Sequence, residues 1–377
     1  MAITTAGNAF GIDLYKQLDK ATGNIFLSPY SIAVALGLVY VGAKGKTAAE
    51  IARALHLVGL GADSKAGFLT QVKQAPPIGG EGIKFESANA LWGADHYPFN
   101  QDYIATIMAV FGGSLTSVDF SNPEAAADTI NNWVAQKTAN KIEDMVSPDA
   151  LNALTRLVLT NAVYFKAAWT TQFSSYGTVP AGFHTETGMK MVPTMNITHD
   201  FRYGVGAGVK LLALPYAQGG MSMVVILPDE TDGLGRVEAD LDAARLGGWI
   251  AGGQATKVRL ALPKFKTESA FDLNEPLQAL GIVSAFSPET ADLSGIADVP
   301  HDRLFVSDTI HKTYIDVDEI GTEAAAATAI MFAAAGMMQR PPPPPPVPFI
   351  VDHPFLYLIQ DAGTGRILFM GRVTDPA

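Results

Sequence analysis

The chain has 377 residues, 48% of them hydrophobic, with a formal net charge of −11 and an isoelectric point near 5.1. A chain of this length and apolar content can bury a large core. The acidic balance and the lack of a basic cluster argue against nucleic-acid binding, and the absence of cysteine excludes disulfides and cysteine-ligated metals. No apolar run approaches the roughly 20 residues of a membrane-spanning helix.

Two helices are predicted at the N-terminus. An apolar stripe at helical spacing within residues 10–18 predicts the first helix, which ends before a turn at Gly23. Ser28 has the side chain of a helix N-cap and is followed by proline, which is favoured in the first turn. A second, buried helix is therefore expected from there through Val41.

Residues 47–50, Thr-Ala-Ala-Glu, match a capping box and predict a helix over residues 51–57. The overlapping Gly-Lys-Thr that starts at Gly45 has the ending of a phosphate-binding loop. The glycine that this motif requires five residues earlier is replaced by Tyr40, so the nucleotide-binding interpretation is rejected.

The middle of the chain mixes both kinds of element. Residues 123–138 predict an amphipathic helix, residues 153–165 a long apolar strand, and residues 221–227 and 258–262 further strands. The glycines of residues 204–209 lack the spacing of a dinucleotide-binding turn and predict a flexible loop. Intermixed helices and strands indicate an α+β fold rather than a doubly wound sheet.

Enzyme motifs are missing from the sequence. It contains neither a Gly-x-Ser-x-Gly elbow nor a His-Glu-x-x-His zinc helix. The histidines are widely scattered, and none has another at metal-ligand spacing: they are His56, His96, His184, His199, His301, His311 and His353. We therefore expect no catalytic residue, no metal and no cofactor.

The most informative segment is residues 318–340, between a strand-like run at residues 313–317 and six consecutive prolines at residues 341–346. Alanine propensity favours a helix over residues 323–335, stopped by Gly336. A strand is the alternative, because period-two alternation puts an uncharged set on one face: Thr322, Ala324, Ala326, Thr328, Ile330 and Phe332. The only charge, Glu323, then lies on the other face.

The flanking sequence favours the strand. Residues 318–328, Asp-Glu-Ile-Gly-Thr-Glu-Ala-Ala-Ala-Ala-Thr, resemble the hinge of the serpins, protease inhibitors that insert a cut loop into their own sheet. Further matches keep the family's order along the chain: residues 24–32, 42–47, 159–166 with Trp169, 214–228, 352–359 and 367–373. The chain is identified as a serpin, of inhibitory and prokaryotic type.

The resemblance implies an α+β serpin fold with three β-sheets, eight to nine helices and an exposed reactive-centre loop near the C-terminus. It implies one domain over residues 1–377, in which residues 319–348 hold the hinge, the loop and the proline-rich segment. A monomer is expected, and its partner is a target serine protease. Residues 64–74 carry only two lysines, Lys65 and Lys73, so heparin-type activation is not expected.

The family mechanism gives the hinge its role. The protease cuts the loop and forms an acyl-enzyme, and the freed part inserts as a central strand of the main sheet, which stalls deacylation. Insertion requires small, uncharged inward-facing residues, whereas non-inhibitory carriers, chaperones or storage proteins of the family, the alternative function, tend to differ there. The hinge residues are Glu319, Gly321, Thr322, Glu323, Ala324, Ala325, Ala326, Ala327 and Thr328.

Two further sets of residues follow from the resemblance. Ser28, Ser31, Asn161 and His311 would form a hydrogen-bonded cluster where the strands part, with Trp169 at the upper opening of the sheet. The alternative is that these polar side chains are unrelated and individually satisfied. Glu319, at the foot of the hinge, would pair with Lys264.

The resemblance places the cut about sixteen residues after Glu319, at the Ala335–Gly336 bond, with Met337 and Met338 as alternatives. The spacing from Glu319 to Pro354 is longer than the family's, with the excess around the prolines. Proline is excluded from central strands, so the proline run must lie beyond the cut, and it blocks cleavage after Arg340. The bait residues before the cut are Phe332, Ala333 and Ala334.

This bait predicts the target class. Alanine beside the cut suits elastase-like proteases, and Phe332 suits subtilisin-like ones. The prolines predict a polyproline II rod that acts as a stiff spacer, or else docks to an aromatic-lined proline-binding module. The N-terminus has no secretory signal pattern, so an extracellular location is expected only if a leader has been removed, and otherwise a cytoplasmic one.

Overall fold

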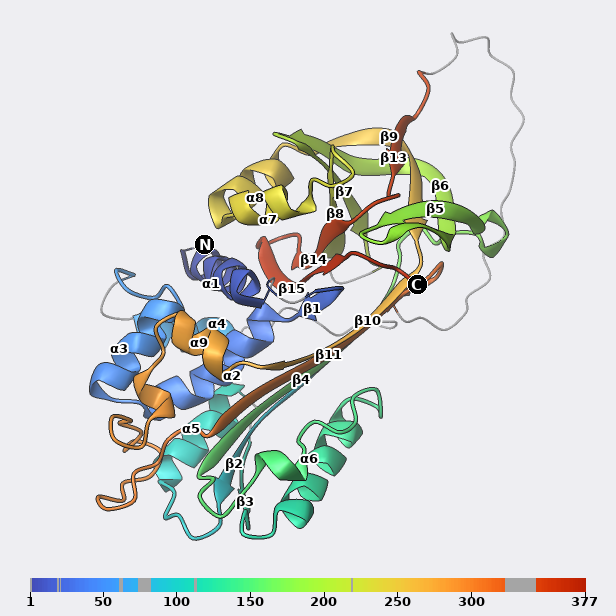
Figure 1. Cartoon of the computed structure of the whole chain (residues 1–377). Coiled ribbons are helices and arrows are strands. Elements are labelled where there is room, and N and C mark those ends of the chain that lie inside the picture. The colour runs from blue at the N-terminus through green and yellow to red at the C-terminus, as the bar shows by residue number, and fades with distance from the viewer. Residues whose placement is uncertain are drawn as a thin grey trace.

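The computed structural model describes residues 2–18, 20, 22–60, 64–73, 83–111, 114–217, 220–322 and 344–377 (Figure 1). In these residues the α-helices are α1 Ala2–Leu18, α2 Pro29–Gly42, α3 Gly45–Ala54, α4 Ser64–Lys73, α5 Gln101–Phe111, α6 Pro123–Lys137, α7 Leu234–Asp240, α8 Ala243–Ala251 and α9 Asn274–Ala279. Short 3-10 turns lie at Pro148–Ala150, Ser175–Gly177 and Ser284–Phe286.

The strands form two hydrogen-bonded sheets. The six-stranded one, here called the main sheet, has the order β10-β11-β12-β4-β2-β3, and the nine-stranded one, the second sheet, has the order β1-β15-β14-β8-β7-β6-β9-β13 with β5 paired to β6. The bounds are β1 Ile25–Leu27, β2 Ile83–Ala94, β3 Ser114–Val118, β4 Leu157–Ala168, β5 Val179–Thr185, β6 Gly188–Gly206, β7 Val209–Pro215, β8 Met221–Pro228, β9 Gln254–Pro263, β10 Phe265–Asp272, β11 Asp308–Val317, β12 Gly321–Thr322, β13 Val347–Ile350, β14 Phe355–Asp361 and β15 Arg366–Val373.

The centre of the main sheet determines where the site lies. β4 and β11 run parallel and pair directly at seven positions, from Asp308 opposite Val158 to Tyr314 opposite Tyr164. Beyond Tyr314 the two strands separate, and the two-residue strand β12 fills the space between them. β4 and β11 are therefore paired directly over most of their length, which we call the closed part of the main sheet. At the other end β12 separates them, and we call this the open end.

Three sheets were expected, and the hydrogen bonds join the strands into two. The reason is β6, which has 19 residues. Its first part pairs with β5 and β9, and its last part pairs with β7. One continuous strand thus joins two groups of strands that would otherwise count as separate sheets.

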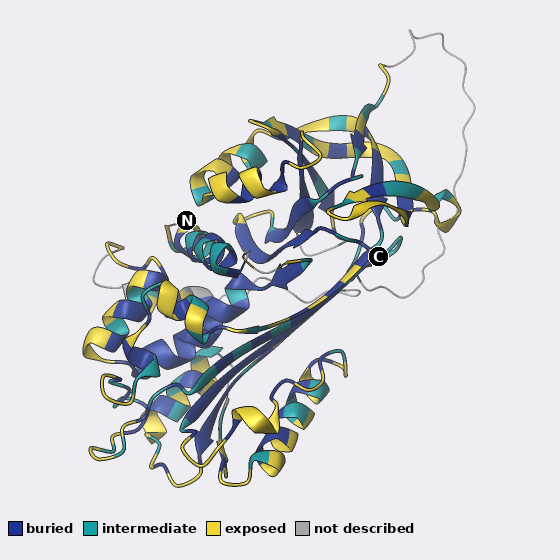
Figure 2. Ribbon diagram, in the orientation of Figure 1, coloured by how far each residue is buried: buried dark blue, intermediate teal, exposed yellow. Residues whose placement is uncertain are grey.

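Two apolar cores surround the main sheet. One lies between its open end and the second sheet and includes Phe165, Tyr216 and Phe369. The larger one joins the rest of the sheet to the helices. α6 covers the face of the main sheet that lies away from α2 (Figure 1). There Trp133 of α6 meets Trp92 of β2 edge to face. β4, β8, β14 and β15 are buried over nearly their whole length, whereas β5 and β6 expose many residues, as do the helices and turns (Figure 2).

Most predicted elements are confirmed. α1 buries its apolar stripe and is followed by Gly23 with φ +85°. α2 starts as predicted, since the Ser28 side chain accepts a hydrogen bond from the Ser31 amide at 3.2 Å. α6, β8 and β9 also lie where the sequence placed them.

The predicted capping box is wrong. α3 begins at Gly45, before the predicted helix start. Thr47 Oγ1 accepts a hydrogen bond from the Asp292 amide at 3.0 Å, and the Glu50 carboxylate accepts from the Ser284 amide at 2.6 Å and its hydroxyl at 3.0 Å. Both side chains tie α3 to distant segments, because a tertiary partner has replaced the local one.

Two boundaries also differ. β4 begins at Leu157 rather than at residue 153, because residues 152–155 form a turn in which the Thr155 amide donates to the Asn152 carbonyl. The glycine-rich residues 204–209 are a tight hairpin rather than a flexible loop: β6 and β7 stay paired up to it, and Gly208 takes φ +76° at the turn.

Candidate functional site

The chain reverses direction sharply between β11 and β12. The Asp318 carboxylate accepts hydrogen bonds from the amides of Ile320 at 2.8 Å and Gly321 at 3.1 Å, an Asx turn. Gly321 then passes so close to β4 that an added Cβ would lie 2.1 Å from the Ala167 carbonyl oxygen. Only glycine allows this close approach of two backbones.

Trp169 lies at the open end of the main sheet, as the resemblance implied. Its Nε1 donates to the Asp318 carbonyl at 2.9 Å, and its amide donates to the Ile320 carbonyl at 2.9 Å. Its ring stacks on Tyr216, with centroids 4.6 Å apart and planes at 11°. Trp169 thus fixes the turn that leads into β12.

Thr322 is the last described residue before the loop, and it lies fully buried between two strands. It pairs with Ala167 of β4 and with Val317 of β11. Its Oγ1 lies 2.7 Å from the hydroxyl of Tyr216. Burial raises the pKa of Tyr216 well above its ordinary value and the Thr322 bond opposes this only in part, so the phenol stays protonated.

Glu319 and Lys264 form the ion pair that was expected. Lys264 Nζ lies 2.8 Å from Glu319 Oε2, and Thr178 Oγ1 donates to Glu319 Oε1 at 2.7 Å. Burial alone would raise the pKa of Glu319, but the bonds from Lys264 and Thr178 outweigh it and the pKa is lowered. A partly exposed pair contributes at most about 1 kcal/mol, so it serves mainly to position the turn.

The four polar residues of the expected cluster lie together. His311 Nε2 accepts a hydrogen bond from the Ser28 amide at 3.1 Å, and its Nδ1 lies 3.2 Å from the Asn161 carbonyl oxygen and also bonds Oδ1 of that side chain. Asn161 Nδ2 donates to Ser31 Oγ at 2.5 Å. Ser28 Oγ donates to the Leu368 carbonyl at 2.8 Å. We call Ser28, Ser31, Asn161 and His311 the central cluster.

These bonds fix the protonation of His311. Since Nε2 accepts from an amide, the ring proton must be on Nδ1, and the imidazole is neutral. Burial lowers the pKa of His311 to about 3, against a smaller raising effect of the Asn161 carbonyl. Protonation at Nε2 would direct two N–H groups at each other, so the cluster holds only with neutral histidine.

The central cluster lies at the closed part of the main sheet. His311 and Asn161 are direct partners in the β11–β4 pairing. A strand inserted between β4 and β11 would therefore separate these two residues. Hydroxyl and amide groups can exchange hydrogen-bond partners, so such a cluster tolerates separation better than fixed charges would.

The sequence did not indicate the roles of three residues of the site, Asn89, Tyr216 and Thr178. Asn89, on β2, accepts a hydrogen bond from Asn161 Nδ2 and another from Ser31 Oγ at 3.4 Å. Tyr216 and Thr178 bond to the hinge as described above. Asn89 meets Asn161 only through the pairing of β2 with β4, so no local pattern could have indicated it.

The remaining predicted residues lie outside the described residues: the hinge from Glu323 to Thr328, the bait, the proposed cut with its alternatives, and the prolines at 341–343. The chain is described again from residue 344 and continues into β13, which pairs in parallel with β9 of the second sheet. The described chain therefore ends in the main sheet at Thr322 and, once described again, enters the second sheet at β13.

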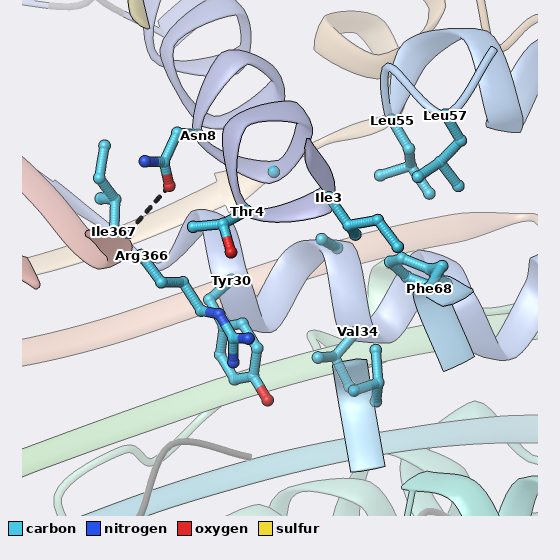
Figure 3. Close-up of a pocket in the computed structure, with 13 residues that line it drawn as sticks. Ile3, Thr4, Asn8, Tyr30, Val34, Leu55, Leu57, Phe68, Arg366 and Ile367 are labelled. Atoms are coloured by element: carbon cyan, nitrogen blue, oxygen red, sulfur yellow. Dashed lines mark hydrogen bonds between the residues drawn. The ribbon is translucent and has the colours of Figure 1, made fainter. Parts of the chain in front are cut away.

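The apolar pocket drawn in Figure 3 contains none of the predicted site residues. This pocket measures about 40 Å³, and its side chains come from α1, α2, α4, the turn after α3 and the start of β15. There the Arg366 guanidinium lies over the ring of Tyr30 at 5.4 Å. The described residues include no group of three or more metal-ligating side chains, and none of their helices combines the length and apolarity needed to cross a bilayer.

Comparison with known proteins identifies the family. Residues 5–376 match the family model described as serpin (serine protease inhibitor). The chain is 39% identical to an uncharacterized serpin-like protein of Thermococcus kodakarensis, covering 99% of this chain and 86% of the relative. It is 37% identical to the leukocyte elastase inhibitor of Bos taurus, covering 99% of both chains.

Solved structures agree with this assignment. The crystal structure of Serpin48 of the insect Tenebrio molitor matches with a TM-score of 0.87 and 35% identity over 99% of this chain and 98% of that one. Uncleaved ovalbumin matches with the same TM-score at 29% identity, with both chains fully covered. Together with the fold described above, these matches establish that the chain belongs to the serpin family of protease inhibitors.

Proposed function

We propose that this protein, as a monomer, is a suicide-substrate inhibitor of serine proteases that traps the acyl-enzyme by inserting its cut loop between β4 and β11. The position of Thr322 carries the proposal. It is already paired to both strands and fully buried, so the first residue of the inserting strand is in place before any cut.

Continuing the same pairing predicts the register of the inserted strand. Thr322 lies opposite Ala167, so Thr328, six residues later, falls opposite Asn161. Counted from Val317 on the other side, Thr328 falls opposite His311. An inserted Thr328 would thus lie between the two residues that insertion separates, and its hydroxyl can both donate and accept.

The two faces of the predicted strand fit their surroundings. Residues at even positions follow Thr322 into the core, where Phe165 and Val163 of β4 are fully buried. The register puts Ala324 and Ala326 beside them, and small side chains fit there without displacing the core. Glu323 falls on the opposite face, beside Lys166.

The chemistry comes from the protease. Its serine oxygen attacks the Ala335 carbonyl, the bond to the Gly336 nitrogen breaks, and the new amine leaves with a proton. The ester that remains ties the protease to the inserting segment. A twelve-residue strand spans about 40 Å at roughly 3.3 Å per residue, so its insertion would move the tethered protease by this length along the sheet. Distortion of its catalytic geometry by about 1 Å can slow deacylation on the order of 100-fold.

The target class follows from the bait. Ala335 suits a shallow apolar primary pocket, and Phe332 suits the apolar outer subsite of subtilisin-like enzymes. The 37% identical bovine relative is named leukocyte elastase inhibitor, which supports an elastase-like target. We therefore expect elastase-like or subtilisin-like proteases to be trapped and trypsin-like ones not to be.

The test is to incubate the protein with elastase, subtilisin, chymotrypsin and trypsin and to look for a covalent complex that survives SDS. Sequencing the released C-terminal peptide gives the cut, expected to start at Gly336. Cleavage by every protease without any SDS-stable complex would contradict inhibition and favour a non-inhibitory role. A peptide that begins at Met338 or Gln339 would move the cut to Met337 or Met338.

A further inference from the structure

Tyr216 has a fixed position beside the hinge. It directly follows β7, and its amide donates to the Met221 carbonyl at 3.0 Å. Its ring is held between Trp169, on which it stacks, and Phe165, which it meets edge to face with centroids 5.3 Å apart. Only 3% of the residue is exposed. The phenol therefore has no room to turn towards solvent.

The hydroxyl of Tyr216 depends on the hinge for its hydrogen bond. Among the described residues its only hydrogen-bond partner is Thr322 Oγ1, at 2.7 Å, and Thr322 Oγ1 likewise bonds only to Tyr216. If Thr322 left the slot between β4 and β11, the Tyr216 hydroxyl would stay buried without a partner. A buried hydroxyl left unpaired lowers the population of that state by roughly tenfold or more.

We infer that Tyr216 is a positioning residue: its hydroxyl holds Thr322 inside the main sheet before cleavage and thereby decides how often insertion succeeds. This inference rests on the proposed inhibitory function. The yield of trapped protease depends on the rate of insertion relative to the rate at which the acyl-enzyme is hydrolysed. A strand whose first residues are already paired only has to extend, whereas a withdrawn hinge must first find its register, and chain ordering opposes that step.

The pair of hydroxyls permits a double-mutant test. Tyr216→Phe and Thr322→Val each remove one hydroxyl and keep the shape of the side chain. Either change leaves the other hydroxyl buried and unpaired, which favours withdrawal of the hinge. We expect each single variant to lower the ratio of trapped to released protease by roughly tenfold, while the rate of bait cleavage stays that of wild type because the cut lies far along the loop.

The double variant Tyr216→Phe/Thr322→Val should recover much of the trapping, since replacing both partners of a buried hydrogen bond by apolar groups is nearly neutral. Tyr357→Phe is the matched control. Tyr357 is a fully buried tyrosine of the same apolar core, and its hydroxyl has no bond to β12 in the described part of the chain. It should trap protease as wild type does.

The measurements are the yield of SDS-stable complex per protease added and the rate of bait cleavage, for all five proteins. The inference is overturned if wild type traps protease and Tyr216→Phe traps it equally well. It is also overturned if Tyr357→Phe loses as much trapping as Tyr216→Phe, or if the double variant shows the summed loss of the two single ones. A wild type that forms no covalent complex at all contradicts the proposed function instead.

Discussion

Nε2 of His311 accepts a hydrogen bond from the amide of Ser28 at 3.1 Å. This contact joins β11 of the main sheet to the N-cap of α2, 283 residues apart in the sequence. It leaves the ring proton on Nδ1, which points to Asn161 of β4. One neutral imidazole therefore holds together the helix α2 and the two strands that the proposed insertion would separate.

The first prediction is a pH dependence of stability. The pKa of His311 is about 3 in the folded protein against an ordinary value of 6.5, so only the unfolded chain takes up a proton between these values. Its contribution to the free energy of unfolding is complete above about pH 6.5 and falls by about 1.4 kcal/mol per pH unit towards pH 3. Denaturant midpoints measured from pH 7.5 to 4.5 should show this loss.

His311→Gln provides the comparison. The variant should be less stable at pH 7.5, because the bonds to Ser28 and Asn161 are lost or weakened. Its stability should fall less steeply on acidification than that of wild type, because no imidazole remains to be protonated in the unfolded state. Equal slopes for the two proteins would rule out His311 as the source of the acid sensitivity.

Gly321→Ala should displace the hinge. The added Cβ would lie 2.1 Å from the Ala167 carbonyl oxygen and 2.7 Å from the Ala168 Cα, and backbone atoms of a central strand cannot move aside. Steric strain of about 1–3 kcal/mol would push β12 away from β4. We expect the yield of covalent complex to drop on the order of tenfold while bait cleavage continues. Gly247→Ala in α8, with open space around its Cβ, is the control and should behave as wild type.

Thr322→Arg should convert the inhibitor into a substrate. The side chain of residue 322 lies in a fully buried slot beside Tyr216, and an unpaired guanidinium there costs several kcal/mol. Cleavage should proceed at a similar rate while the covalent complex disappears. Thr187→Arg, on an exposed turn, adds the same charge and should change neither quantity. Trapping by Thr322→Arg at wild-type stoichiometry would exclude insertion as the mechanism.

Cleavage within the bait should stabilise the protein. Insertion along the predicted register would replace the seven direct pairs between β4 and β11 by a new central strand paired on both sides. The thermal midpoint should rise on the order of tens of degrees, because the proposed mechanism requires the intact form to be a kinetically trapped state. Calorimetry of intact and cleaved protein measures the difference. Equal midpoints would place the protein among the non-inhibitory members of the family.

The identity of the primary bait residue can be tested by Ala335→Arg. If Ala335 occupies the primary pocket, the change should abolish trapping of elastase and create trapping of trypsin, whose acidic pocket binds arginine. The controls are Met337→Arg and Met338→Arg, which change the alternative positions. Elastase trapping that survives Ala335→Arg but disappears with one of these controls would assign the cut to that methionine.

Local patterns in the sequence determined much of the fold. The stripe of α1 and the Ser28 cap of α2 depend on contacts within a few residues, so composition and spacing suffice to predict them. Order and spacing of motifs along the whole chain indicated the family. The period-two alternation that begins at Thr322 predicted which residues of an inserted strand would face the core.

The tertiary structure decided which side chains meet. Thr47 and Glu50 fit a capping box in the sequence, yet they bond to Asp292 and Ser284, which are more than 230 residues away. Asn89 and Tyr216 carry no local signal, because each acquires its role only when strands distant in the sequence are brought side by side. Sequence patterns report the geometry of one element, whereas a hydrogen bond between elements depends on how the whole core packs.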